Sequence, residues 1–143
     1  QTTVAAAIAA GVVMVAAAGN DGTCNAAYPA AYPGVISVAA TGQGVDALAP
    51  FSQHGPDVDL AAPGTNIWSD YLGGTYISMS GTSMATPYVS AAAALVVAKC
   101  PGSTPAQVEA RLESTAQPIA GSPIQTSSPS GALRAGAATA APC

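Results

Sequence analysis

The sequence predicts an α/β fold built around a mostly parallel sheet, and three patterns support this prediction. Residues 12–16 and 35–39 are short apolar runs rich in β-branched side chains, which are typical of strands buried on both faces of a parallel sheet. Residues 83–99 carry apolar side chains at helical spacing. Predicted strands therefore alternate with predicted helices, which is the arrangement of α/β domains.

The first half of the chain predicts one helix and three strands. Residues 2–10 are rich in alanine without an interior breaker, so they favour a helix that ends at Gly11. The runs 12–16 and 35–39 follow as strands. Residues 58–61 form a weaker third strand pattern.

A hairpin and a long helix are predicted next. Residues 65–69 and 75–80 flank Gly73 and Gly74, a pair that favours a turn between two strands. The helix over residues 83–99 is rich in small side chains, which permit close packing, so we expect it to be central.

The last third of the chain predicts a shorter helix and a tail. Thr104 and Gln107 have the spacing of a capping box, with Pro105 at the first helical position. Residues 119–130 are rich in Ser and Pro and favour a loop. Residues 131–141 favour a final short helix.

Composition indicates a folded domain and argues against two classes of partner. The 143 residues suffice for one domain, and only 7% are charged, with a formal net charge of −4. The few basic residues are scattered, whereas nucleic acids and anionic membranes require clustered Lys and Arg. The apolar run 4–18 is similar to a signal peptide, but no basic residue precedes it and it is too short to cross a bilayer.

The three cysteines are Cys24, Cys100 and Cys143, and an odd count leaves one thiol over. A bridge between Cys100 and Cys143 would staple the tail, as suits a secreted protein. Cys24 would then pair with a segment outside this chain. Three free thiols are the alternative.

The strongest chemical pattern is the segment 80–87, with Ser83 at the start of the long predicted helix. A helix N-terminus offers free N–H groups that suit a developing oxyanion, and Gly81 lets a substrate backbone approach closely. Two other interpretations compete. Ser83 or Thr82 can be a plain helix N-cap, and a G-x-S-x-G nucleophile elbow would need glycine where this chain has Ala85.

A second pattern is Asn20, which follows the strand predicted over residues 12–16. It lies at the carboxyl end of that strand, where open α/β sheets place ligands. Its side-chain amide is able to donate to an oxyanion. The alternative is an asparagine that serves only the turn 20–22.

Together these two segments resemble the subtilisin-like family of serine peptidases, the subtilases, and the likeness covers nearly the whole chain. Residues 12–22 resemble the strand that leads to the family's oxyanion asparagine, and residues 81–87 resemble its nucleophile motif. Further ordered matches are Tyr28-Pro29, residues 32–38, Phe51-Ser52 with Gly55, Asp59 with residues 62–64, and Gly131, Leu133 and Ala137-Ala138. The resemblance implies that residues 1–143 are the C-terminal portion of a subtilisin-like three-layer fold, a partial peptidase domain.

The resemblance also implies the reaction, a hydrolysis of peptide bonds that needs no catalytic cofactor. Ser83 would attack the peptide carbonyl carbon, while Asn20 and the Ser83 N–H group stabilise the oxyanion. Ala17, Ala18 and Gly19 would form one wall of the pocket for the side chain before the scissile bond. Gly81 and Thr82 would lie beside the substrate backbone. The expected substrates are proteins or peptides.

A structural calcium site is implied by the same resemblance. Its ligands would be the carbonyl oxygens of Pro33 and Val35 and the Asp59 carboxylate, and oxygen ligands of this kind suit calcium. A solvated or turn acid is the alternative for Asp59.

One departure from the family pattern decides what this chain can do alone. In subtilases the catalytic Asp and His precede the oxyanion asparagine, whereas neither residue type occurs before Asn20 here. The only histidine is His54, at a loop position. We therefore expect a complementary N-terminal half of the same protease to supply both groups. Tyr88 and Ala91 also replace the family's usual His and Gly, and they bear on packing.

The origin and the alternative function of such a chain remain open at this point. It can be one product of a nicked protease, a truncated sequence or a short protein in its own right. The alternative function is a catalytically inactive fragment that acts as a binding or assembly module. The resemblance, the low charge and the cysteines favour a secreted, extracellular protein.

Overall fold

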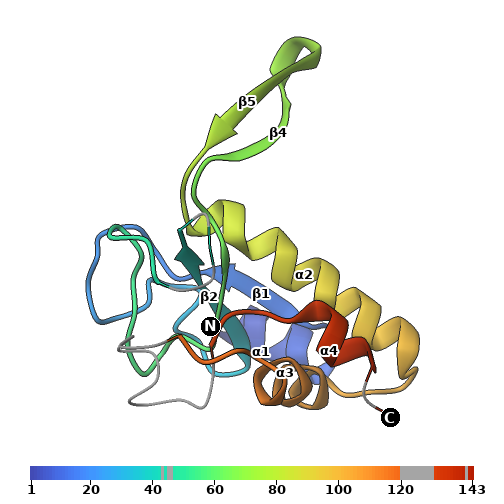
Figure 1. Ribbon diagram of the computed structural model, residues 1–143. Helices are drawn as coiled ribbons and strands as arrows, with labels where there is room; N and C mark the ends of the chain where they lie inside the picture. The colour runs from blue at the N-terminus through green and yellow to red at the C-terminus, as the bar shows by residue number, and fades with distance from the viewer. Residues whose placement is uncertain (43, 45–46, 120–130, 141) are drawn as a thin grey trace.

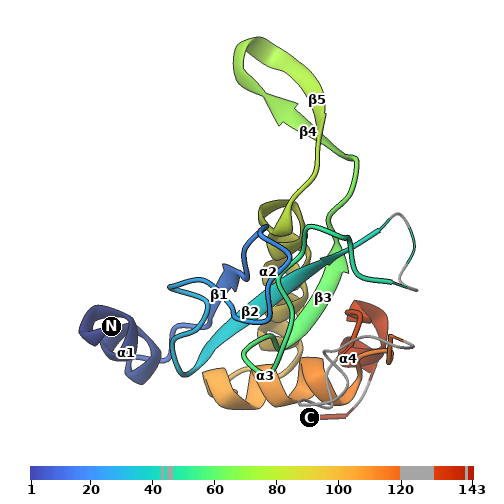
Figure 2. The ribbon, with the colours of Figure 1, turned by 90° about the vertical axis from the view of Figure 1, so that its left-hand side faces the viewer.

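A small parallel sheet and a separate hairpin organise the chain. The computed structural model describes residues 1–42, 44, 47–119, 131–140 and 142–143. In chain order its elements are α1 (Thr2–Ala9), β1 (Met14–Ala17), β2 (Val35–Thr41), β3 (Leu60–Pro63), β4 (Ile67–Tyr71), a 3-10 turn (Leu72–Gly74), β5 (Thr75–Met79), α2 (Thr82–Lys99), α3 (Pro105–Ser114) and α4 (Ala135–Ala140). Strands β1, β2 and β3 form the parallel sheet in that order, and β4 and β5 form an antiparallel hairpin that projects from the body of the molecule (Figures 1 and 2).

Burial of the strands follows their position in the sheet. All seven residues of β2 are buried, because β2 pairs with β1 through Val15 and Ile36 and with β3 through Ala39 and Ala61. The four residues of β1 are only half-buried. The prediction of a strand buried on both faces is therefore wrong for residues 12–16, since β1 lies at an edge of the described sheet, whereas the other edge strand, β3, is bridged by Ala132.

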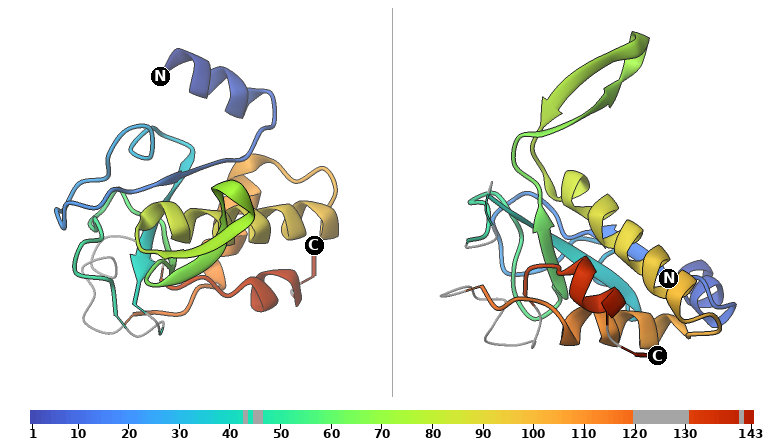
Figure 3. Two further views of the ribbon diagram at one scale, coloured as in Figure 1. Left: turned by 90° about the horizontal axis from the view of Figure 1, so that it is seen from above. Right: turned by 45° about the vertical axis from the view of Figure 1, so that its right-hand side comes forward.

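Helix α2 is central, as predicted, and packs across one face of the sheet (Figure 3). Its small side chains, among them Ala85, Ala92 and Ala93, let it approach the strands closely. The buried core on this face comprises Ile36, Val38, Ala40, Ala49, Leu60, Ala62, Ala85, Val89, Ala92, Ala93, Val96, Val108, Leu112 and Ala138. Helices α2, α3 and α4 thus lie on one side, and loops with Ala26, Ala30 and Val58 cover the other.

The capping box of α3 is confirmed. Gln107 N–H donates to Thr104 Oγ1 at 3.3 Å, and Thr104 N–H donates to Gln107 Oε1 at 2.8 Å. The final helix α4 is shorter than the predicted span 131–141. Of the loop predicted over residues 119–130, only Ile119 lies within the described residues.

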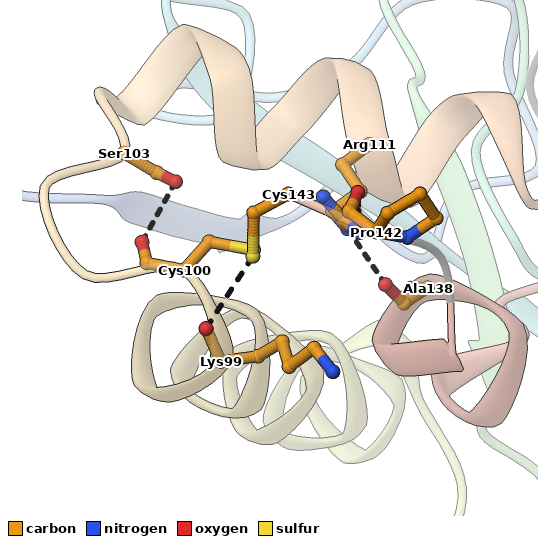
Figure 4. The surroundings of a disulfide bond; sticks show 7 residues. All are labelled: Lys99, Cys100, Ser103, Arg111, Ala138, Pro142 and Cys143. Carbon is orange, nitrogen blue, oxygen red and sulfur yellow. Dashed lines mark hydrogen bonds between the residues drawn. A yellow bond between two sulfur atoms is a disulfide. The ribbon is translucent and has the colours of Figure 1, made fainter.

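A disulfide joins Cys100, at the end of α2, to Cys143, with 5.6 Å between the two Cα atoms (Figure 4). Arg111 reinforces this closure, since its Nε donates to the Ala138 carbonyl oxygen and its guanidinium also donates to that of Pro142, both at 2.7 Å. Cys24 is exposed and free. The alternative of three free thiols is therefore wrong. Among the helices that the structure describes, none is long and apolar enough to cross a membrane.

Candidate active site

Asn20 lies on the loop that begins where β1 ends. Ala18 N–H donates to the Val38 carbonyl oxygen at 2.9 Å, which prolongs the parallel pairing by one residue. Gly19 then turns the chain with a φ of 119°, a conformation that favours glycine. A side chain at Gly19 would also overlap the Gln53 side chain. The exposed Asn20 is thereby placed at the carboxyl end of the sheet.

Hydrogen bonds join this loop to the start of α2, 62 residues further along the chain. The Thr82 N–H and the Thr82 hydroxyl both donate to Asn20 Oδ1, at 2.9 Å and 3.1 Å. Gly19 N–H donates to Thr82 Oγ1 at 3.2 Å, and the Thr82 side chain is fully buried. Because Oδ1 accepts two bonds, the Asn20 amide is oriented with its Nδ2 group free to donate, and no described residue accepts from it.

Ser83 is the second residue of α2 and is exposed, and its Oγ makes no hydrogen bond with any described residue. The N-cap of α2 is Gly81, which has no side chain to cap the helix, and the Thr82 N–H bonds Asn20 instead. The interpretation of Ser83 or Thr82 as a plain N-cap is therefore wrong. The Ser83 N–H lies in the first turn, where the helix supplies no acceptor and the macrodipole is positive.

The segment before α2 is fixed from the other side by β3. Gly81 N–H donates to the Gly64 carbonyl oxygen at 2.8 Å, one residue beyond the end of β3. A side chain at Gly64 would overlap Ala40 and the Gly81 carbonyl oxygen. The start of α2 is thus held both by the sheet and by Asn20, which leaves two free N–H donors beside an unbonded hydroxyl. Such an arrangement suits the stabilisation of an oxyanion formed when that hydroxyl attacks a carbonyl.

A cavity of about 340 Å³ opens beside Ser83. It is lined by Ile67, Trp68, Ser69, Ser83, Met84, Pro87, Tyr88 and Ala91. Most of these side chains are apolar, and they come from β4 and from the first half of α2. A volume of this order accommodates a side chain or a short peptide segment.

The residues predicted as a pocket wall differ in what they expose. Ala18 is fully buried, so both its methyl group and its backbone are covered in this structure. Ala17 and Gly19 are half-buried. Gly81 and Thr82 are buried, and Thr82 orients Asn20 with its side chain.

His54 is not placed to serve as the base for Ser83. Its Nε2 lies 3.3 Å from Cys24 Sγ, and its Nδ1 lies 3.4 Å from the Ser52 carbonyl oxygen. No carboxylate of a described residue bonds its ring. His54 is the only histidine of the sequence, so no histidine base for Ser83 is in place among the described residues.

The three predicted calcium ligands lie together. Pro33, Val35 and Asp59 line one cavity of about 240 Å³, together with Glu109. Asp59 Oδ2 accepts the Ser37 N–H at 2.7 Å. Burial, with smaller contributions from nearby carboxylates, raises the pKa of Asp59 to about 7. Asp59 is therefore not a freely solvated acid.

Three functional candidates were missed by reading the sequence. Glu109 and Glu113, one helical turn apart on α3, bring carboxylate oxygens within 4.8 Å of each other and of an Asp59 oxygen. The signal in the sequence was their spacing of one helical turn, which places both carboxylates on the same face of a helix. Burial and the charge of Glu113 raise the pKa of Glu109. Gln53 is the third, and it bonds the loop that carries Asn20; no local pattern marks it.

Comparisons of the chain with known families and proteins give several matches. The sequence profile of the Subtilase family, a peptidase family, matches residues 1–136. The chain is 48% identical over 120 residues to subtilisin of Bacillus pumilus, covering 81% of this chain and 43% of the relative. It is 48% identical over 107 residues to a thermostable alkaline protease of Halalkalibacterium halodurans, covering 75% of this chain and 29% of the relative.

Solved structures show the same likeness. A protease structure from Pseudoalteromonas arctica superposes with a TM-score of 0.86 at 32% identity, covering 98% of this chain and 45% of that one. A cold-adapted subtilisin-like serine proteinase superposes with a TM-score of 0.78 at 37% identity, covering 85% of this chain and 45% of that one. The chain thus spans less than half the length of these relatives.

Proposed function

Since the chain belongs to the subtilase family of serine peptidases, we propose that it is the nucleophile-bearing half of a subtilisin-like serine endopeptidase. The observation that carries this proposal is the pair of hydrogen bonds from Thr82 to Asn20 Oδ1. They bring the end of β1 to the start of α2 and turn the Asn20 amide so that Nδ2 can donate. The unbonded Ser83 hydroxyl lies next in the chain.

The proposed reaction assigns each group a role. Ser83 Oγ attacks the carbonyl carbon of the scissile peptide and passes its proton to a histidine. Asn20 Nδ2 and the Ser83 N–H donate to the oxyanion that forms. The peptide C–N bond then breaks as the histidine gives its proton to the leaving amine, and water hydrolyses the resulting ester, which frees the acid and restores the Ser83 hydroxyl. The proposed substrates are proteins or peptides that would lie beside Ser83, with the half-buried Ala17 and Gly19 contributing to one wall of the pocket for the side chain before the scissile bond.

The catalytic Asp and His are proposed to come from a complementary N-terminal half of the same protease. The support is an apolar surface on the described residues. Strand β1 has a free edge, and a cavity of about 610 Å³ beside it is lined by Val13, Met14, Val15, Ser90, Ala93, Ala94, Val97 and Ala98. Val12 and Leu95 are 47% and 55% exposed. An unpaired strand edge and an apolar patch of this kind favour association.

A structural calcium ion is proposed at the cavity of Pro33, Val35 and Asp59. The residues fit the ion, because backbone carbonyls and carboxylates are the oxygen ligands that calcium prefers. A cation would also offset the mutual repulsion of Asp59, Glu109 and Glu113, which lie within 4.8 Å of one another. The ion would hold the start of β2 to the start of β3 and take no part in catalysis.

Secretion is part of the same proposal. The Cys100–Cys143 disulfide supports it, because such bonds persist in oxidising, extracellular compartments.

The test is native mass spectrometry of the purified protein, followed by labelling with a fluorophosphonate. We expect a second polypeptide to co-purify and the label to reside on Ser83, with none on Ser83→Ala. Asn20→Ala in the assembled protease is expected to lower kcat by about 10²–10³-fold, a magnitude carried over from the oxyanion asparagine of subtilisin itself rather than derived from this structure.

The second candidate function is an inactive binding or assembly module, which the exposed apolar surface along β1 and α2 also favours. A lone chain with unlabelled Ser83 would select this function. It would also overturn the proposal of an assembled protease.

A further inference from the structure

Segment 53–55 runs alongside the loop that carries Asn20. Gln53 N–H donates to the Gly19 carbonyl oxygen, and His54 N–H donates to that of Thr23, both at 3.0 Å. Gly55 packs so closely on the Cys24 carbonyl that a side chain there would overlap it. These contacts place residues 19–24 against a second segment over their whole length.

The Gln53 side chain adds two bonds to the same loop. It is only 5% exposed, so an unmade bond would leave a buried polar group without a partner. Its Oε1 accepts the Asp21 N–H at 3.3 Å, and its Nε2 donates to the Asn25 carbonyl oxygen at 2.7 Å. With the backbone bond to Gly19, Gln53 holds the residues on both sides of Asn20.

We infer that Gln53 is a positioning residue for the oxyanion hole, an inference that rests on the proposed function of Asn20. Thr82 fixes the amide end of the Asn20 side chain, and Gln53 fixes the backbone from which that side chain starts. Asn20 itself is exposed and makes no backbone hydrogen bond to a described residue. Its Nδ2 is therefore kept in place by its neighbours.

The chemistry of Gln53 matches this task. One end of the amide must accept from an N–H and the other must donate to a carbonyl, and an uncharged amide does both without burying a charge. The contact between the Gln53 amide and Gly19 leaves no room for a side chain at Gly19. The Gly19 and Gln53 positions are thus matched to each other.

Gln53→Met is the informative variant, because it keeps the length of the side chain and removes both bonds. Ser52→Ala is the matched control. Ser52 is equally buried at 2%, and its Oγ accepts from Ala40 N–H at 2.9 Å and donates to the Gln53 carbonyl oxygen, without touching the loop. Both variants lose buried hydrogen bonds, but only one loses those that flank Asn20.

The first readout is amide hydrogen exchange in this chain, which needs no catalysis. Gln53→Met is expected to speed exchange of the Asp21 and Thr82 N–H groups about tenfold or more, since Thr82 N–H depends on Asn20 as its acceptor. Ser52→Ala is expected to leave both rates near those of the parent. Unchanged exchange at Thr82 in Gln53→Met would overturn the inference.

The second readout is kinetic, in the protease assembled with its N-terminal half. Gln53→Met is expected to lower kcat by about tenfold to hundredfold with KM within about twofold, as for a misplaced catalytic group. In an Asn20→Ala background it should lower kcat no further. An additive loss of kcat would show that Gln53 serves only the fold. If the parent protease itself is inactive, the proposed function fails, and the exchange rates still decide the role of Gln53.

Discussion

Thr82→Val tests the junction between β1 and α2 most directly. The substitution keeps the shape of a side chain that is fully buried and removes its hydroxyl. Gly19 N–H then loses its acceptor, because among the described residues it donates to Thr82 Oγ1, at 3.2 Å. Asn20 Oδ1 keeps the Thr82 N–H and loses the hydroxyl at 3.1 Å.

The cost follows from these two bonds. Leaving a buried N–H without an acceptor costs about 1–3 kcal/mol. For a domain of this size, a loss of about 2 kcal/mol lowers Tm by about 4–8 °C. Because Asn20 is also less firmly oriented, we expect kcat of the assembled protease to fall by about tenfold.

The assay is thermal denaturation followed by circular dichroism, with Thr86→Val as the control. The Thr86 hydroxyl donates only to the Thr82 carbonyl oxygen within α2, at 2.8 Å, so the same substitution there tests the helix without the junction. Thr82→Ser, which keeps the hydroxyl, should restore kcat. If Thr82→Val were no less stable than Thr86→Val and kept its kcat, the junction would not orient Asn20.

Three further predictions concern the tail, the calcium site and the free thiol. Cys143→Ser removes the disulfide that closes a loop of 43 residues, and the chain-entropy model gives a loss of stability of about 4 kcal/mol. We expect a lower urea midpoint than that of the parent. An unchanged midpoint would mean that the disulfide does not stabilise the fold. In the absence of calcium, burial raises the pKa of Asp59 to about 7 in the folded state, whereas the unfolded state releases this proton near pH 4. The folded state therefore binds more protons between these values, so stability should fall as pH rises from about 4 to about 7. Asp59→Asn should remove this fall of stability with pH, and calcium should offset it. Thermal melts across this pH range measure the effect, and a fall that persists in Asp59→Asn would mean that another group is responsible. Thiol titration of the denatured, unreduced protein should count one thiol, Cys24, and three after reduction, whereas three before reduction would exclude the disulfide.

Local patterns were sufficient for most of the elements. The capping box of Thr104 and Gln107, the hairpin around Gly73 and the helix over residues 83–99 each depend on neighbours within a few residues, so the sequence contains the whole cause. The strand over residues 12–16 was wrong in its burial, because burial depends on whether another strand lies beside it. No window of local sequence contains that information.

The candidate site divides in the same way. The residue types and their order along the chain marked Asn20 and Ser83, because a nucleophile at a helix start and an amide at a strand end follow recurrent patterns. Whether Ser83 caps its helix was decided by the fold, since the cap position is taken by Gly81 and Thr82 bonds Asn20 instead. Gln53 and the approach of Glu109 to Asp59 likewise arise from contacts between segments far apart in sequence. Such contacts are determined by how the sheet and helices pack, and packing is a property of the whole chain.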